Sequence, residues 1–401
     1  MSEIIYLDNQ ATTRVDPRVV EAMLPVFDQS YANAGSVTHE LGLAASDLVE
    51  ESAESIANCL NARRSEIVFT SGATESNNLA IRGVCLRKRT SGHIIAVETE
   101  HKAVLDPIAR LEKQGFRITR LKVVPNGSDD AGLIHLDELA NAIADDTILV
   151  SVMMAHNEIG VIQPIREIAD LCHDRGVLLH TDATQAVGHL PVDVDELGVD
   201  LMSFSAHKFY GPKGIGGLYV RRTDRRVRLA SQIDGGGQQE NRRSGTLNVP
   251  GIVGMATALD LCHAEIQEGT EDQRRHELRD RMYAGLESRV GHLPLNGPSL
   301  ELPELRLSNN LNCQFPNIDG HSIMSGCPEV AISSGSACTS ADPEPSHVLA
   351  ALKLSDDEIQ SSLRISVGRF TTSDEIDLAV DLLVRSVESM RQYGNDECLD
   401  S

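Results

Sequence analysis

Short apolar runs alternate with longer segments between residues 66 and 220, and this alternation constrains the fold more than any other feature of the sequence. The runs have the length of strands, and the segments between them are long enough for helices. Repeated β–α units predict an α/β fold with a parallel sheet and helices on both of its faces. We expect strands at residues 66–70, 93–97, 148–154, 177–180, 201–204 and 216–220, the last of them able to run antiparallel.

Polar side chains follow the carboxyl ends of five of these predicted strands. In an open α/β sheet, ligands bind at that edge. The polar segments begin at Ser71, Glu100, His156, Thr181 and Ser205. Five polar clusters at one edge are more than chance placement suggests, and they predict a single binding site.

Lys208 lies in the segment Ser205-Ala206-His207-Lys208, at the end of a predicted buried strand. Desolvation lowers the pKa of a lysine in such a place, and a neutral amine is the nucleophile that forms a Schiff base. The chain has only seven lysines against 29 arginines, which makes this placement notable. The alternative is an ordinary surface lysine at a strand end.

The small residues Ser71-Gly72-Ala73-Thr74 stand between a predicted strand and a predicted helix. Small residues let main-chain N–H groups approach an anion, and the helix N-terminus adds a favourable dipole. The stretch is therefore either a phosphate cradle or a plain serine-capped helix. No Gly-Lys-Ser/Thr follows, so it is not a P-loop.

Four further residues at strand ends could surround a planar ring. Asp182 could keep a pyridine nitrogen protonated, or could cap the next helix. His101 could stack on the ring and move protons, or could be a capping or core histidine. Gln185 and Asn157 could reach a ring oxygen.

Two C-terminal residues offer other chemistry. Cys338 stands in the hydroxyl-rich segment at residues 333–340, which predicts a mobile loop whose thiol is either an accessible nucleophile or incidental. Arg364 lies in a strand-like run and could offer a bidentate fork to a carboxylate, or a surface salt bridge.

Composition limits the classes of function. A net charge of −23, no Trp and 3% aromatic residues argue against a direct nucleic-acid surface. No apolar run is long enough for a bilayer, and no signal peptide is visible. The eight cysteines form no CxxC pair and no metal-ligand spacing, so we expect free thiols, a cytoplasmic protein and no metal.

The character of the sequence changes in its last third. A helix is expected from about residue 253 to 290, broken near Gly269, and then strands at residues 304–311 with scattered helices. We expect a large cofactor-binding domain at residues 15–260. Residues 1–14, a short extended arm, and residues 261–401 would form a smaller α+β domain.

These stretches together resemble the class V, fold-type I pyridoxal phosphate enzymes, and most closely the cysteine desulfurases of the IscS/NifS type. The resemblance covers residues 4–385 and rests on motifs that occur in the family's order. They are Tyr6-Leu7-Asp8-Asn9-Gln10-Ala11-Thr12-Thr13, Thr70-Ser71-Gly72-Ala73-Thr74-Glu75-Ser76, His180-Thr181-Asp182-Ala183-Thr184-Gln185, Ser205-Ala206-His207-Lys208, Arg243-Ser244-Gly245-Thr246 and Ser333-Ser334-Gly335-Ser336-Ala337-Cys338. The last is similar to the long-loop group of the family. Residues 33–35 (Asn-Ala-Gly) and 238–239 (Gln-Gln) depart from the family pattern, which bears on the entrance and the dimer contact.

The resemblance implies a mainly parallel seven-stranded sheet with helices on both faces, and a role for each candidate residue. Lys208 would hold pyridoxal phosphate as a Schiff base, with His101 stacked on the ring and Arg364 on the substrate carboxylate. Cys338 would attack the sulfur of L-cysteine. The remaining cofactor contacts would be Asp182 at the pyridine nitrogen, Gln185 and Asn157 at the ring oxygen, Ala73, Thr74, Ser205 and His207 at the phosphate, and Thr246 at the phosphate of the neighbouring subunit in a homodimer.

The implied activity is that of a cysteine desulfurase. It would convert L-cysteine to L-alanine and pass a persulfide on Cys338 to an acceptor protein, such as a scaffold for iron–sulfur clusters, or towards thio-modification of tRNA or DNA. The alternatives are a selenocysteine lyase and a class V aminotransferase. An aminotransferase needs no loop cysteine, so Cys338 favours a desulfurase over an aminotransferase.

Overall fold

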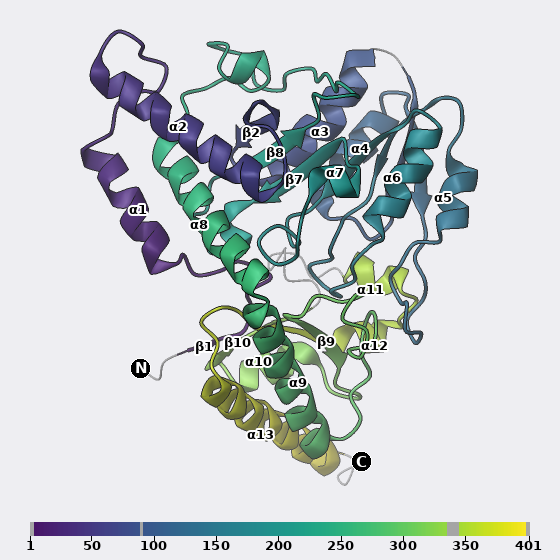
Figure 1. The fold of residues 1–401 in the computed structure, drawn as a ribbon. Coiled ribbons are helices and arrows are strands. Elements are labelled where there is room, and N and C mark those ends of the chain that lie inside the picture. The colour runs from purple at the N-terminus through teal and green to yellow at the C-terminus, as the bar shows by residue number, and fades with distance from the viewer. Residues whose placement is uncertain (1–3, 89–90, 335–344, 398–401) are drawn as a thin grey trace.

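A seven-stranded sheet forms the centre of the computed structural model, which describes residues 4–88, 91–334 and 345–397 (Figure 1). The strand order is β2-β8-β7-β6-β5-β3-β4, and β8 runs antiparallel to both of its neighbours while the other pairs are parallel. The predicted fold class is confirmed, including the antiparallel strand. The strands are β2 (Ile67–Thr70), β3 (His93–Val97), β4 (Arg117–Leu121), β5 (Thr147–Ser151), β6 (Leu178–Asp182), β7 (Leu201–Ser205) and β8 (Gly216–Val220).

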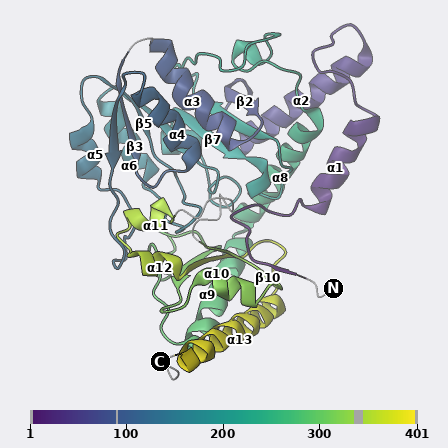
Figure 2. The ribbon, with the colours of Figure 1, turned by 180° about the vertical axis from the view of Figure 1, so that it is seen from behind.

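Helices cover both faces of this sheet (Figures 1 and 2). One core cluster joins α3 and α4 to side chains such as Val68 and Ile94, and another joins α2, α6 and α8 to Phe69 and Ile95. Successive strand residues face opposite clusters, which explains why the strands appear in the sequence as continuous apolar runs. The helices of the sheet region are α1 (Pro17–Asp28), α2 (Glu40–Cys59), α3 (Ala73–Lys88), α4 (Lys102–Glu112), α5 (Leu136–Ala142), α6 (Ile165–Asp174), α7 (Val194–Leu197) and α8 (Val249–Glu268).

A smaller antiparallel sheet lies beyond α8. Its order is β11 (Ser333–Ser334), β12 (Ser362–Ser366) and β9 (Asn310–Gln314), and a parallel pair joins β1 (Ile5–Tyr6) to β10 (Val330–Ala331). A separate apolar cluster fills the space between these strands and the helices α9 and α13. The helices here are α9 (Thr270–Val290), α10 (Gly320–Gly326), α11 (His347–Ala351), α12 (Asp356–Gln360) and α13 (Ser373–Glu397).

The predicted strand at residues 304–311 is wrong over most of its length, because β9 begins only at Asn310. Arg306 is fully buried, and its guanidinium donates to Pro298 O and to both oxygens of Asn310. Residues 305–307 pair instead with residues 160–162, through an isolated bridge between Arg306 and Val161. The break in the long helix is correct, since Gly269 ends α8 with φ +71°.

The N-terminal arm connects the two sheets. Asp8 forms a bridge with Ser366 of β12, and Thr13 N donates to His207 O beyond β7. The division into domains at residues 260 and 261 stays a prediction. Side chains of α11 and α12, such as Leu349 and Ile359, belong to the core cluster of the larger sheet. None of the helices in the described part of the chain is both long and apolar enough to cross a membrane.

Candidate active site

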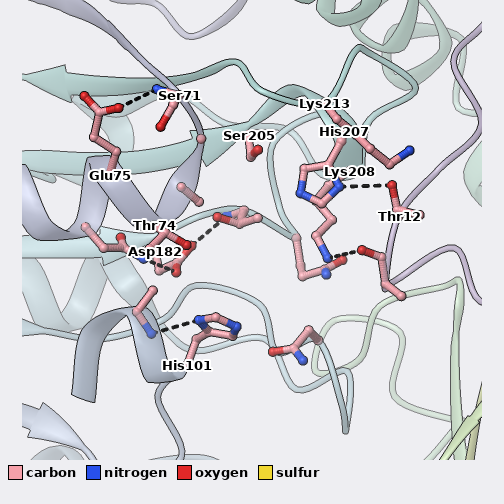
Figure 3. A pocket seen from close by; sticks show the side chains of 18 of the residues that line it. Thr12, Ser71, Thr74, Glu75, His101, Asp182, Ser205, His207, Lys208 and Lys213 are labelled. Atoms are coloured by element: carbon pink, nitrogen blue, oxygen red, sulfur yellow. Dashed lines mark hydrogen bonds between the residues drawn. The ribbon is translucent and has the colours of Figure 1, made fainter. Parts of the chain in front are cut away.

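A cavity of about 590 Å³ opens at the carboxyl edge of the larger sheet (Figure 3). Nine of the predicted site residues line it, together with Ala11 and Thr12 of the arm and with Lys213. The nine lie at the ends of β6 and β7, or shortly after the ends of β2, β3, β5, β6 and β7, which the topology brings to one edge. They are Ala73, Thr74, His101, Asn157, Asp182, Gln185, Ser205, His207 and Lys208.

Lys208 stands on a short 3₁₀ turn, Ala206–Lys208, directly after β7. Its Nζ donates to the main-chain oxygens of Gln10 at 2.5 Å and of Ala11 at 2.8 Å. The side chain is half-buried and extends towards the arm, as Figure 3 shows. The arm therefore supplies two carbonyl acceptors for the protons of this amine.

Asp182 is the last residue of β6, and its carboxylate is held on both oxygens. Asn77 Nδ2 of α3 donates to Oδ2 at 2.7 Å, and the main-chain N–H of Thr184 donates to Oδ1 at 3.0 Å. The side chain therefore stabilises the turn that follows β6, but the alternative that it caps the next helix is wrong, because the next helix is α7 at Val194. Asp182 also lines the cavity, where its acceptor lone pairs can face a protonated ring nitrogen.

His101 precedes α4 and caps it. Its Nδ1 accepts from the Ala103 N–H at 3.0 Å, so the neutral ring carries its proton on Nε2. Burial lowers the pKa of His101 below its usual value, Asp182 opposes this shift, and Lys208 adds to it. His101 is therefore able to donate a hydrogen bond from Nε2, and its role as a proton donor or acceptor stays a prediction.

The turn from β2 into α3 is where the sequence predicted a cradle for an anion. Strand β8 approaches this turn closely at Gly216. A Cβ atom on Gly216 would lie only 2.6 Å from Gly72 Cα, so a glycine is required there. The turn brings Gly72 opposite Ser205 Oγ, and the first N–H groups of α3 have no helical acceptor. Burial lowers the pKa of His207 to about 4, with Lys208 and Lys213 adding to the shift. His207 is thus a neutral hydrogen-bonding group at this cradle.

Two amide residues complete the ring side of the cavity. Gln185 Nε2 donates to Gln10 O at 2.9 Å, which leaves one of its N–H groups for another acceptor. Asn157 lines the cavity, and its main-chain oxygen accepts from Arg364 Nη1 at 3.0 Å. Thr184 Oγ1, which belongs to a cavity-lining residue, is buried and has no hydrogen-bond partner. A hydroxyl left in this way fits a cavity that receives a polar ligand.

Arg364 does not line the cavity, but it donates a hydrogen bond to Asn157, which does. It is buried in β12 and ion-paired, with Nη2 2.7 Å from Asp8 Oδ1, so the surface salt bridge considered from the sequence is wrong. Its Nε is buried and has no hydrogen-bond partner. The guanidinium therefore keeps donor capacity for a carboxylate.

One other predicted residue, Thr246, is placed differently. Thr246 is exposed and does not line the cavity of its own chain. Arg243, three residues earlier, binds Glu75 of α3 at 2.8 Å, which fixes this loop beside the cradle. Cys338 lies outside the described residues.

Sequence reasoning did not single out several residues of the site. Asn77 follows the cradle on the same helix, but its asparagine carried no signal that it would contact Asp182. The acceptors for Lys208 are main-chain atoms of Gln10 and Ala11, which no side-chain pattern could identify. Within the described ranges, no group of three or more His, Cys, Asp or Glu side chains is arranged to hold a metal ion.

A second layer of buried groups lies behind the cavity. Burial raises the pKa of Glu158 to about 7, although Ser346 Oγ donates to its Oε2 at 2.6 Å and Arg364 opposes the shift. His156 is fully buried, and burial lowers its pKa to about 4. These groups connect the segment after β5 to the start of α11.

Known proteins with similar sequences belong to the family that the sequence motifs suggested. The class-V aminotransferase family model matches residues 5–379. Cysteine desulfurase IscS of Anaeromyxobacter dehalogenans (strain 2CP-C) is 48% identical over 391 residues, which cover 97% of this chain and 94% of that protein. The chain belongs to the class-V aminotransferase family. Within it, cysteine desulfurase IscS of Ehrlichia chaffeensis (strain ATCC CRL-10679 / Arkansas) is 46% identical, over 97% of this chain and 92% of that protein.

Solved structures of this family share the fold. A NifS-like protein superposes with a TM-score of 0.85 and 36% identity, covering 97% of this chain and all of the other. SspA in complex with cysteine superposes with a TM-score of 0.77 and 35% identity, covering 92% of this chain and 99% of that one. The expected family and fold are confirmed, and with them an enzyme of a pyridoxal phosphate-dependent family.

Proposed function

We propose that the chain is a cysteine desulfurase that takes sulfur from L-cysteine, releases L-alanine and carries the sulfur as a persulfide on Cys338. The observation that supports this most is the meeting of Lys208, Asp182 and His101 in one cavity of a chain whose relatives are cysteine desulfurases. A lysine and a carboxylate are the groups that bind pyridoxal phosphate and keep its ring nitrogen protonated, and an imidazole can move protons beside it.

The residues around the cavity fit pyridoxal phosphate. Lys208 would bind the aldehyde carbon, Asp182 would accept from the ring N–H, and Gln185 and Asn157 would reach the ring oxygen. Ala73 and Thr74 at the start of α3, with Ser205 and His207, would hold the phosphate. When bound, this cofactor supplies an electron sink that stabilises negative charge on the substrate carbon.

The protein's own groups would position L-cysteine and receive its sulfur. Arg364 would hold the substrate carboxylate, and the Nε2–H of His101 would donate a hydrogen bond inside the cavity. The Cys338 thiolate would attack the substrate sulfur, so that an S–S bond forms as the C–S bond breaks. The electron pair of the C–S bond stays on carbon, which takes up a proton and leaves as L-alanine.

A second copy of this chain is the partner that we propose for the face formed by α1 and the start of α2. Apolar side chains are exposed there on neighbouring segments, which is unusual for a monomer. They are Val20, Leu24, Phe27, Tyr31, Val37, Leu41 and Leu43. Figures 1 and 2 show α1 and α2 on the outer flank of the molecule. In such a homodimer, the exposed Thr246 would reach the phosphate in the partner's cavity.

The persulfide would pass to a sulfur-acceptor protein, such as an iron–sulfur scaffold, or serve thio-modification of tRNA or DNA. We propose a cytoplasmic location, because the six cysteines of the described chain are free thiols, which suits a reducing compartment. A selenocysteine lyase would use the same cavity. A class V aminotransferase would have no use for Cys338.

The experiment that separates these activities compares the parent with Cys338→Ser. The parent should release alanine and form a protein persulfide from L-cysteine, and the variant should keep the absorbance of the bound cofactor without forming a persulfide. Normal sulfide release by the variant would contradict the role of Cys338. Release of a keto acid in place of alanine would indicate an aminotransferase.

A further inference from the structure

The main-chain oxygen of Lys208 accepts a hydrogen bond from the imidazole of His189, with 2.8 Å between His189 Nε2 and the oxygen. We propose that His189 is a positioning residue, which fixes the peptide plane at Lys208 and thereby aims the lysine amine into the cavity. This inference rests on the proposed role of Lys208 as the residue that binds the cofactor. His189 itself does not line the cavity.

His189 reaches this position because Gly188 has no side chain. Gly188 adopts φ +81°, and a Cβ on it would lie 2.4 Å from Phe209 Cβ. This close contact brings the loop that follows β6 directly against the turn that carries Lys208. Asp182 ends the same strand, so one segment supplies both a cavity carboxylate and the histidine behind the lysine.

Arg275 of α9 determines which nitrogen of His189 carries the proton. Its Nη1 lies 3.0 Å from His189 Nδ1, and a guanidinium can only donate, so Nδ1 accepts and Nε2 carries the hydrogen. Burial lowers the pKa of His189 to about 3, and Arg275 and Arg369 add to the shift while Asp272 opposes it. His189 is therefore a neutral donor to Lys208 throughout the neutral pH range.

The turn after Lys208 needs such support because its backbone is strained. Tyr210 is not a glycine, yet it adopts φ +66° in the left-handed region. Neighbouring hydrogen bonds hold this conformation: Tyr210 N donates to Thr13 Oγ1 at 2.8 Å and Thr13 N donates to His207 O at 2.9 Å. The bond from His189 adds a restraint at Lys208 itself, and the His189 ring packs edge-on against Tyr210 with 6.2 Å between centroids.

A merely structural histidine and a positioning histidine respond differently to substitution. His189→Leu keeps a buried side chain of moderate size but removes the donor. His189→Gln can place an N–H near the position of Nε2. If the hydrogen bond to Lys208 positions the amine, the glutamine variant should capture the cofactor as the parent does, and the leucine variant should capture it more slowly. If only the packing of the ring matters, both variants should be slower.

The test measures how cofactor-free protein captures pyridoxal phosphate and pyridoxal, followed by absorbance. Pyridoxal lacks the phosphate, so its capture reports on the lysine more than on the cradle. We expect capture by His189→Leu to be about 10-fold slower, the effect of one buried hydrogen bond, and capture by His189→Gln to stay within about two-fold of the parent. Binding of 4′-deoxypyridoxine phosphate, which has no aldehyde, should stay within about two-fold in both variants.

Three results would overturn the proposal. The first is equal capture rates in all three proteins. The second is equal losses in the leucine and glutamine variants. The third is a matching loss of 4′-deoxypyridoxine phosphate binding, which would mean that the whole cavity had been disturbed.

Arg275→Met keeps the test decisive if His189→Leu fails to fold. It leaves His189 in place but frees Nδ1, so capture should slow and become dependent on pH, with Asp272 and Arg369 as the remaining charged groups that act on the ring. Arg279→Met is the matched control, because Arg279 is also buried on α9 but binds Asp280 and Leu300 O instead of His189. Equal capture by the two arginine variants would contradict the proposal. Capture by Lys208→Ala, in contrast, would overturn the assignment of Lys208 itself.

Discussion

Asn77 Nδ2 donates to Asp182 Oδ2 at 2.7 Å and so joins α3, which carries the anion cradle, to the end of β6. Both side chains line the cavity, and both are nearly inaccessible to solvent. The helix that would hold the phosphate therefore also fixes the carboxylate that would hold the ring. A cofactor bound at one end is oriented at the other.

Replacing Asp182 with Asn should separate cofactor binding from turnover. The charge-assisted contact to the ring nitrogen is lost, so we expect turnover of L-cysteine to fall by about 100-fold while the bound cofactor keeps its absorbance. Asn77→Leu should lower turnover by about 10-fold, because Asp182 keeps its charge but loses one partner. Asn78→Leu is the control, since Asn78 is only partly buried and donates to Thr74 O rather than to Asp182. Full turnover in Asp182→Asn would contradict the role of the carboxylate.

His101 should respond differently to Asn and to Ala. Asn can accept from the Ala103 N–H as Nδ1 does, so His101→Asn should keep the stability that His101→Ala loses, about 1 kcal/mol in urea unfolding. Neither variant has the ring or its Nε2–H, so both should turn over L-cysteine about 100-fold more slowly. Retained turnover in the Asn variant would limit His101 to capping α4.

Arg364→Lys should weaken substrate binding specifically. Lysine keeps the positive charge beside Asp8 but cannot present two parallel donors to a carboxylate. We expect KM for L-cysteine to rise by about 10-fold or more, with a smaller change in kcat. Arg306→Lys changes another fully buried arginine outside the cavity and serves as the control. An unchanged KM in Arg364→Lys would remove this residue from the substrate site.

Glu158 should make stability depend on pH. Burial raises its pKa from 4.5 to about 7, so the folded state binds its proton more tightly than the unfolded state does. Its contribution to the free energy of unfolding is therefore present below about pH 4.5 and declines as pH rises through about 7. As pH rises from 5 to 8, the free energy of unfolding of Glu158→Gln should increase relative to that of the parent by up to about 3 kcal/mol.

The variant must be compared with the parent at each pH, because His156 changes the free energy of unfolding with pH in the opposite direction. Its pKa is lowered to about 4, so its contribution is lost as pH falls through that range. Glu301→Gln at the exposed surface should change nothing. A constant difference between Glu158→Gln and the parent across these pH values would mean that Glu158 is ionised throughout.

The sequence predicted the strands that carry apolar runs and the polar residues that follow them. Strand β4 was not found, because Arg117–Leu121 lies at the edge of the sheet and is only partly buried, so it shows no such run. The strand expected at residues 304–311 begins only at Asn310, because the residues before it form an isolated bridge between Arg306 and Val161, a contact with a distant segment that no local pattern predicts.

Contacts across the chain were beyond sequence reasoning for another reason. The acceptors for Lys208 are main-chain oxygens of the arm, and the partner of Asp182 is an asparagine on a helix that contacts it only after folding. Residue type records what a side chain can do, but not which distant backbone atom the fold will place beside it.

The visible spectrum of the purified protein, recorded before and after L-cysteine is added, tests the central claim most directly when alanine and released sulfur are quantified in the same sample. We predict the absorbance of bound cofactor, its loss in Lys208→Ala, and equal amounts of alanine and sulfur. Bound cofactor without release of sulfur would contradict the desulfurase assignment. If added pyridoxal phosphate gave no absorbance of bound cofactor, the roles proposed for Lys208 and for the cavity around it would be contradicted.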